Sequence, residues 1–158
     1  MSNFIGVKLV DAEPITLGAY NALRGWGLPT DENYDEPGYF IKHPDDYVTW
    51  CPKKTFERDH MPIVKGDTVT EEDVDAMIKQ IHVDLITPND LGSVVTVTTV
   101  TLANGFTITE SSTCVDPENY DVEIGVDCCM ERIKDKIWYL LGFLLSCGFN
   151  GFQKGGGK

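Results

Sequence analysis

The sequence predicts an α+β protein, in which short antiparallel strands and helices follow one another along the chain. Two stretches carry the β signal: GYFIKHPDDYVTWCP, and SVVTVTTVTLANGFTITESSTC with the hairpin turn Asn104-Gly105. A helical signal closes the chain, where Asp116-Pro117 precedes a long apolar segment. We therefore expect a small antiparallel sheet module, followed by a helix, a β-hairpin and a long C-terminal helix.

Three segments follow from this order of elements. Residues 1–64 are expected to form the small α+β module, 68–148 a helix–hairpin–helix module, and the glycine-rich 149–158 a flexible tail. Lys65-Gly66-Asp67 marks the boundary between the modules, because glycine and aspartate favour turns. A chain of 158 residues is the size of one domain or of two small ones.

The first module is expected to begin with a strand, Phe4–Val10, which ends before Pro14. A short helix over Leu17–Arg24 should follow, because Thr16 is a good N-cap and Gly25 a good helix stop. A tryptophan comes next between two glycines, where a ligand or another backbone can approach it closely.

A hairpin forms the centre of this module. Its strands are Tyr39–His43 and Tyr47–Cys51, joined by the turn cluster Pro44-Asp45-Asp46, and Pro52 ends the second strand. After it we expect a short turn or helix over Lys53–Asp59 and a closing strand over Met61–Val64. The aromatic residues of the hairpin are expected to share one flat face: Tyr39, Tyr47 and Trp50.

The second module should begin with a helix at Thr70, whose first turn is acidic. Apolar residues at three- and four-residue spacing predict that this helix continues to Leu85, with His82 beside the stripe: Val74, Met77, Ile78, Ile81 and Leu85. In the hairpin Val94–Cys114, the pair Thr98-Thr99 interrupts the alternation, which indicates a bulge or a change of buried face. The threonine-rich face could be an oligomer interface or simply solvated, and we expect it to be solvated.

The last helix is apolar on nearly all sides over Ile137–Leu145. A helix of this kind must be buried on more than one side, and a chain of 158 residues has little else to cover it. We therefore expect a homo-oligomer.

Composition limits the possible partners. The net charge of −12 argues against general binding to DNA or RNA, which depends on neutralising phosphates. The five cysteines have no zinc-ligand spacing, so free thiols in a reducing compartment are expected. The start of the chain has no signal-peptide pattern. The longest apolar run of the whole sequence, Ile137–Cys147, is too short to span a bilayer.

No catalytic or cofactor motif is present, so neither enzymatic activity nor a cofactor is expected. Basic residues do lie on or beside the aromatic hairpin: Lys42, His43, Lys53, Lys54 and Arg58. Aromatic faces next to positive charge suit a nucleotide, because the base stacks and the phosphate forms ion pairs. The alternative is that these aromatic residues are the core of a small module.

Residues 1–63 resemble the type-two Thoeris anti-defence proteins of phages. The resemblance is carried by a helix followed by Gly-Trp, a hairpin closed by Trp-x-Pro, and a later aspartate: Gly25, Trp26, Trp50, Pro52 and Asp59. Members of that family are sponges, non-catalytic oligomers that sequester the nucleotide signals of bacterial immunity. The resemblance implies stacking by Trp26 with Trp50 or Tyr39, phosphate contacts from Arg24, Lys53 or Lys54, and base-edge hydrogen bonds from Asp59.

Residues 70–147 resemble a second family of small tailed-phage proteins, to which no activity is assigned. The shared features are an Asn-Gly-Phe hairpin and an Asp-Pro-x-Asn-aromatic-Asp helix start: Asn104, Gly105, Phe106, Asp116, Pro117, Asn119, Tyr120, Asp121, and then Trp138.

The two resemblances together imply a phage protein in the cytoplasm of the infected host. The first alone implies its function, the sequestration of a cyclic nucleotide or cyclic ADP-ribose-type signal. The alternative is an acidic interaction module that inhibits a host protein, since strong negative charge steers towards basic partners. An enzyme acting on nucleotides is the third possibility.

Overall fold

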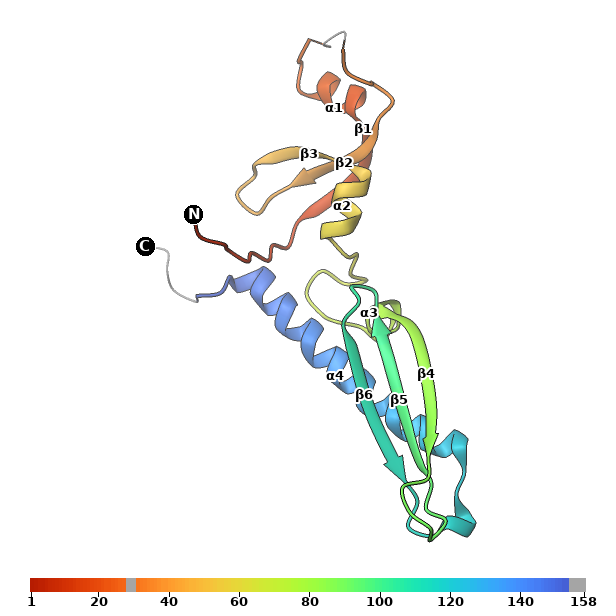
Figure 1. The fold of residues 1–158 in the computed structure, drawn as a ribbon. Coiled ribbons are helices and arrows are strands. Elements are labelled where there is room, and N and C mark those ends of the chain that lie inside the picture. Colours follow the sequence, from red (N-terminus) through yellow and green to blue (C-terminus); the bar gives the residue numbers. More distant parts are fainter. Residues whose placement is uncertain (28–30, 154–158) are drawn as a thin grey trace. The chain divides into compact units, whose positions relative to one another are not determined.

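The computed structural model describes residues 1–27 and 31–153, and within them the chain separates into two compact units (Figure 1). The first comprises Met1–Pro62 and the residues from Ser146 onward; the second is Ile63–Leu145. Each contains one three-stranded antiparallel sheet with helices, so the predicted α+β class is confirmed. Part of the predicted tail, residues 154–158, lies outside the described residues.

The sheet of the first unit has the order β1-β2-β3, formed by Asp11–Thr16, Pro37–Lys42 and Val48–Pro52. The expected strand over Phe4–Val10 is wrong, because the strand lies further along and contains Pro14, opposite Tyr39. β1 is an edge strand, and an edge tolerates a residue without a backbone N–H. The expected strand over Met61–Val64 is also absent.

Two short helices belong to this unit. α1 (Leu17–Leu23) is capped by the Thr16 hydroxyl, which accepts from the backbone N–H of Ala19 at 3.3 Å, as the sequence predicts. α2 (Lys53–Asp59) follows β3 directly. The predicted hairpin is present. The N–H of His43 donates to the carbonyl of Tyr47 at 2.8 Å, which leaves a three-residue loop with Asp46 at φ 60°, the left-handed residue that such loops require.

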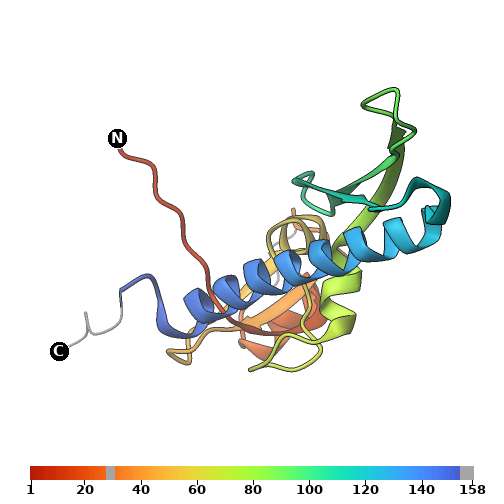
Figure 2. The ribbon, with the colours of Figure 1, turned by 90° about the horizontal axis from the view of Figure 1, so that it is seen from below.

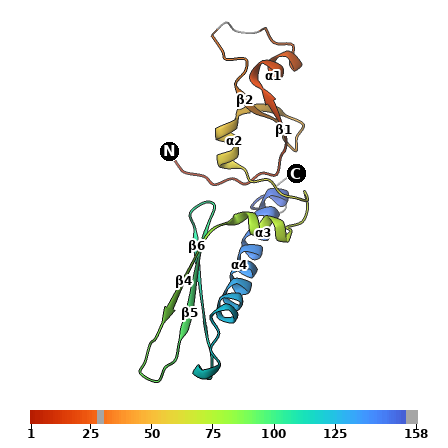
Figure 3. The same ribbon diagram turned by 90° about the vertical axis from the view of Figure 1, so that its right-hand side faces the viewer.

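The second unit consists of α3 (Glu71–Met77), the strands β4 (Ile78–Ile86), β5 (Val95–Leu102) and β6 (Thr107–Thr113) in the order β4-β5-β6, a short 3₁₀ turn at Pro117–Asn119, and α4 (Val122–Asn150). Figure 2 shows α4 as one unbroken helix. It lies along one face of the sheet (Figures 1 and 3). We call this the inner face. Between sheet and helix lies the core: Val69, Val74, Val100, Leu102, Ile108, Ile133, Ile137 and Leu141.

The expected helix from Thr70 to Leu85 is correct only up to Met77, where β4 replaces it. Ile81, Val83 and Leu85 alternate along this strand and lie opposite Val100, Thr98 and Thr96 of β5. The same apolar residues fit a helical stripe and a strand, and the β-branched side chains together with pairing to β5 decide for the strand.

The expected change of face at Thr98-Thr99 is wrong, because β5 pairs with both neighbours without a bulge at this position. Its even-numbered residues are buried along the whole strand, so Thr96 and Thr98 lie in the interior. The expectation of a solvated threonine face is therefore wrong for Thr96 and Thr98. The Thr96 hydroxyl is satisfied by the hydroxyl of Tyr120 at 2.7 Å.

Candidate functional site

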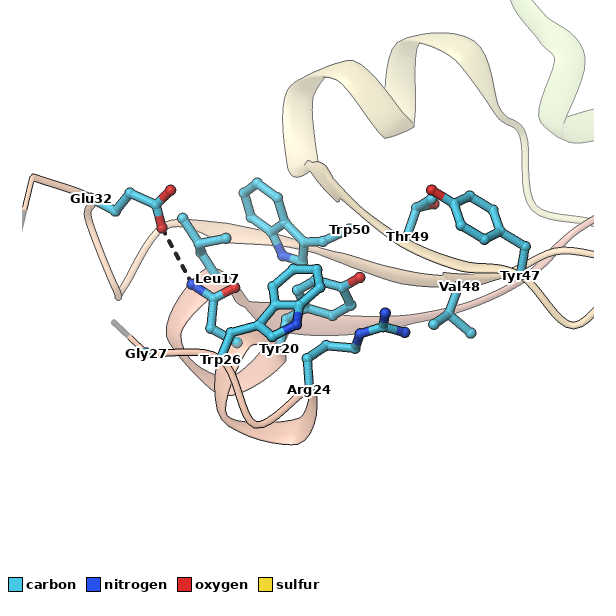
Figure 4. Close-up of a pocket in the computed structure, with 11 residues that line it drawn as sticks. Leu17, Tyr20, Arg24, Trp26, Gly27, Glu32, Tyr47, Val48, Thr49 and Trp50 are labelled. Carbon is cyan, nitrogen blue, oxygen red and sulfur yellow. Dashed lines mark hydrogen bonds between the residues drawn. The ribbon is translucent and has the colours of Figure 1, made fainter. Parts of the chain in front are cut away.

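A hollow of about 520 Å³ opens beside α1 in the first unit (Figure 4). Its size falls within the range of small-ligand sites, about 300–1,000 Å³. Residues of α1, of the segment around it and of the β2–β3 hairpin line it: Leu17, Tyr20, Asn21, Arg24, Trp26, Gly27, Glu32, Tyr47, Val48, Thr49 and Trp50. Among the described lining residues, the hollow thus unites aromatic side chains with the guanidinium of Arg24 and the carboxylate of Glu32.

The end of α1 positions Trp26. Gly25 has φ 66°, its N–H donates to the carbonyl of Ala22 at 3.1 Å, and the N–H of Trp26 donates to the carbonyl of Asn21 at 3.0 Å. These two bonds form a Schellman motif, which characteristically brings the residue after the glycine against the last helical turn. The Trp26 ring accordingly meets Tyr20 edge to face, with centroids 5.9 Å apart.

Trp26 remains 52% exposed despite that contact. The guanidinium of Arg24 lies 4.9 Å from the centroid of its ring, in a cation–π arrangement. Among the residues that the structure describes, no carboxylate lies within ion-pair distance of Arg24. An arginine over a half-exposed indole, without a carboxylate partner, is available to an anionic aromatic ligand.

Trp50 contributes the second indole of the hollow. Its Nε1–H donates to the carbonyl of Ile15 at 3.4 Å, which draws the ring across the neighbouring strand β2. There it lies over Gly38, where a side chain would overlap it. Trp50 is therefore a fixed, half-buried part of the wall.

Asn21 and Glu32 supply further polar groups. Glu32 lies on the other side of Trp26 from Arg24 in Figure 4. The Asn21 side chain is buried, and its Nδ2–H donates to the Glu32 carboxylate at 3.3 Å. One side of the hollow can therefore accept hydrogen bonds, while the side of Arg24 offers positive charge.

The strand register places Tyr39 on the opposite face of the sheet. Phe40 pairs with Trp50, and the preceding residue, Tyr39, pairs with Cys51. Successive side chains of a strand alternate between the two faces of the sheet, so Tyr39 and Trp50 lie on opposite faces. The expected shared face of Tyr39, Tyr47 and Trp50 is thus wrong for Tyr39. That ring stacks on Phe56 of α2 at 4.3 Å.

Lys53, Lys54 and Asp59 also lie on α2 and do not line the hollow. Lys53 approaches Glu57 at 3.8 Å, and Asp59 accepts two hydrogen bonds from Arg58, at 2.7 and 2.9 Å. These hydrogen bonds lower the pKa of the Asp59 carboxyl. Of the seven predicted site residues, the structure unites Arg24, Trp26 and Trp50 and separates the other four from them.

Sequence reasoning missed Asn21 and Glu32 as lining residues and gave Tyr20 only a packing role. The sequence does contain a signal for the lining residues that belong to α1. Leu17, Tyr20, Asn21 and Arg24 recur at three- and four-residue spacing, so they form one side of the helix. No comparable local pattern marks Glu32.

The fold and the hollow define a two-unit α+β protein with a candidate small-ligand site in the first unit. Comparison with family models then identifies the second unit. Residues 69–148 match the phage protein (N4 Gp49/phage Sf6 gene 66) family, and the chain belongs to that family. Neither the curated proteins nor the solved structures gave a significant match.

The matched residues do not include the hollow, which lies in residues 17–50. In the described part of the chain, no group of side chains has the composition of a metal site. No helix among residues 1–27 and 31–153 is long and apolar enough to cross a membrane.

Proposed function

We propose that this phage protein binds a cyclic nucleotide or cyclic ADP-ribose-type immune signal in the hollow of its first unit and sequesters it without cleavage. Sequestration of such a signal in the host cytoplasm would protect the phage from a defence that depends on it. The proposal rests on the resemblance of residues 1–63 to nucleotide sponges and on the chemistry of the hollow.

One observation carries most of the argument: Arg24 lies 4.9 Å from the centroid of the half-exposed Trp26 ring. A purine could stack on the indole, since stacking on aromatic side chains contributes about 1–3 kcal/mol per base. The adjacent guanidinium could then bind phosphate through charge-assisted hydrogen bonds. Trp50 and Tyr47 extend the aromatic wall.

The polarity of the hollow suggests an orientation for the ligand. Phosphate belongs beside Arg24, because the Glu32 carboxylate would repel it. Ribose hydroxyls or a base amino group belong near Glu32 and Asn21, which can accept their hydrogen bonds. Asp59, assigned to the base edge by the resemblance, has no part in this arrangement.

The lining residues favour binding over catalysis. Glu32 is the single carboxylate among the described lining residues, it already accepts from Asn21, and no histidine or cysteine accompanies it. Hydrolysis of a phosphodiester ordinarily needs a metal or a positioned acid and base. This supports the role of a sponge over the nucleotide-cleaving alternative.

The test is a binding screen of the full chain against cyclic dinucleotides, cyclic trinucleotides and cyclic ADP-ribose isomers. Thermal shift should identify the ligand, because a hundredfold excess over the dissociation constant adds about 2.7 kcal/mol of stability. Mass spectrometry of ligand released by heating then distinguishes the mechanisms. Intact ligand is expected, and a cleaved product would replace the sponge with an enzyme.

Absence of stabilisation by every compound in the panel would reject the nucleotide proposal. The acidic interaction module would then be the better explanation of a chain with net charge −12.

A further inference from the structure

β4 is an edge strand whose apolar side chains are uncovered, although they lie on the buried side of the sheet. Ile81, Val83 and Leu85 face the same way as Val100, Thr98 and Thr96, their partners on β5. Those partners are 0% exposed, whereas Ile81 is 48%, Val83 37% and Leu85 53% exposed. α4 therefore covers the inner face over β5 and leaves the same face open along β4.

The other edge of this sheet is protected, and the contrast is informative. Arg132 of α4 donates to the backbone carbonyl of Ser111 on β6 at 2.8 Å. Glu110 of the same strand pairs with Arg132 and Lys136. Proteins usually shield edge strands with such charges or with proline, because free backbone groups invite another strand.

β4 is less protected, because its one carboxylate, Asp84, points to the face opposite the apolar row. Its irregularity lies at the start, between Ile78 and Gln80 beside Lys79. Beyond it, Gln80–Ile86 contains neither proline, glycine nor lysine. This seven-residue run has no strand neighbour on its outer side within the described sheet, and it carries a row of exposed apolar side chains, so it is suited to pairing with another strand.

We propose that β4 pairs with β4 of a second copy of this chain, antiparallel about a two-fold axis at Val83, to form a continuous six-stranded sheet. Each copy contributes the three strands of its second unit, Ile63–Leu145. In this register Val83 faces the same residue of the second copy, and Ile81 faces Leu85. The apolar row of one protomer thus meets the apolar row of the other on the inner side of the sheet.

Charge complementarity on the outer side supports the same register. His82 and Asp84 point to the face opposite Val83, and within one chain the His82 Nε2 lies 3.2 Å from the Asp84 carboxylate. With Val83 on the axis, His82 of each protomer faces Asp84 of the other. Moving the axis to His82 would place two histidines opposite each other, and moving it to Ile81 would place Ile78 opposite Asp84. Both shifts lose complementarity.

This inference is independent of the proposed ligand site, because all its residues belong to the second unit. It also places the dimer interface on β4 instead of on the apolar stretch of α4 from which the sequence predicts an oligomer.

Sedimentation equilibrium of the full chain tests the proposal. The unmodified chain should be a dimer at micromolar concentration. Val83→Lys should raise the dissociation constant about a hundredfold, because the axis places the change twice in the interface and opposes like charges. Thr107→Lys makes the same kind of change on the exposed edge of β6 and should leave the dimer intact.

A charge swap tests the register. His82→Asp should weaken the dimer by opposing carboxylates, and His82→Asp combined with Asp84→His should restore it. Val83→Cys gives a further readout if the lysine variant does not fold. Directly opposed residues have Cβ atoms about 4.5–5.5 Å apart, close enough for mild oxidation to link the protomers. Thr107→Cys is the control for the five native cysteines.

A monomer at 100-fold higher concentration, or a dimer that Val83→Lys leaves unchanged, would overturn the proposal. A dimer that survives Val83→Lys would show that the protomers associate through another surface, such as α4. A monomer would show that the β4 edge does not bind a second copy of this chain. Absence of a Val83→Cys cross-link above the Thr107→Cys background would equally contradict it.

Discussion

The indole ring of Trp50 lies directly over Gly38, which belongs to the neighbouring strand of the first sheet. A Cβ atom at position 38 would overlap the ring and lie 2.5 Å from the carbonyl oxygen of Cys51. The ring reaches this position because its Nε1–H donates to the carbonyl of Ile15 beyond the glycine. One wall of the hollow therefore depends on the absence of a side chain at Gly38, on the strand that lies between Trp50 and Ile15.

Gly38→Ala should therefore destabilise the first unit and displace Trp50. Ring movement alone cannot relieve the overlap, because the Cys51 carbonyl belongs to the backbone. We expect a loss of about 2–3 kcal/mol, typical of overpacking, measured by chemical denaturation. Near-ultraviolet circular dichroism should also change. Gly6→Ala is the control, since a Cβ there meets nothing within 4 Å, and equal losses in both variants would contradict the explanation.

Replacement of Trp26 should separate its two roles, the helix stop and the proposed stacking surface. Trp26→Ala loses both, and we expect binding to disappear together with about 1 kcal/mol of stability from the lost contact with Tyr20. Trp26→Leu keeps an apolar contact after the Schellman motif and should recover most of that stability without recovering binding. Calorimetry and thermal melting measure the two effects. Full binding by the leucine variant would show that Trp26 only packs.

Arg24 should be the phosphate ligand, in contrast to the lysines of α2. Arg24→Gln is expected to weaken nucleotide binding about tenfold or more, since a hydrogen bond to a charged group contributes about 1.5–3 kcal/mol. Lys54→Gln removes the same charge on α2 and should have no effect. Because one partly enclosed cation is involved, affinity should fall only modestly between low and physiological salt. A larger effect of Lys54→Gln than of Arg24→Gln would relocate the site to α2.

The hairpin shows what a sequence can and cannot establish about the site. Its position and turn are readable from Pro44-Asp45-Asp46 between β-rich segments. Which aromatic residues share a face depends on the register, and a shift of one residue reverses every side chain. The three-residue loop sets Tyr39 opposite Cys51, so it separates Tyr39 from Trp50.

β4 illustrates a different difficulty. Val74, Ile78, Ile81 and Leu85 have helical spacing, while Ile81, Val83 and Leu85 alternate as in a strand. Only pairing with β5, a contact remote in sequence, decides between the two. The N-terminal half of the predicted helix is correct because its signal is local: Thr70 caps α3 and Asp73 completes a capping box.

Asp73 should make the free energy of unfolding depend on pH in the acid range. Its buried carboxylate accepts from the N–H and hydroxyl of Thr70, both at 2.7 Å, and from the N–H of Val64 at 2.9 Å. Burial alone would raise the pKa of Asp73, but these hydrogen bonds lower it below its ordinary value. Because the folded-state pKa is the lower one, the stabilisation is present above about pH 4 and is lost as pH falls further.

Asp73→Asn should accordingly cost about 1–2 kcal/mol at neutral pH, and its difference from the unmodified chain should shrink below about pH 4. Urea denaturation across pH 3–7 measures this difference. Glu72→Gln neutralises the exposed neighbouring carboxylate and should change stability by less than about 0.5 kcal/mol. If the stability difference between Asp73→Asn and the unmodified chain is as large at pH 3 as at pH 7, the charge of the Asp73 carboxylate does not contribute to stability.

Gly125 offers a test in which helix propensity and side-chain packing predict opposite changes in stability for Gly125→Ala. Alanine in a helix interior is favoured over glycine by about 1 kcal/mol, so propensity alone predicts that Gly125→Ala stabilises α4. Packing predicts the reverse, because a Cβ at position 125 would overlap the Thr96 hydroxyl and lie 3.1 Å from the Thr96 Cβ. That hydroxyl is buried and bonded to Tyr120, so it cannot move freely.

We expect Gly125→Ala to lower the free energy of unfolding by about 1–3 kcal/mol, as overpacking does. Gly142→Ala, in the same helix, meets nothing within 4 Å and should instead raise it by up to about 1 kcal/mol. Thr96→Ala should remove the overlap, so the double variant should be more stable than the two single effects added together. Denaturation of all four variants decides the matter. Stabilisation by Gly125→Ala, or strict additivity with Thr96→Ala, would show that the helix does not approach the sheet through this glycine.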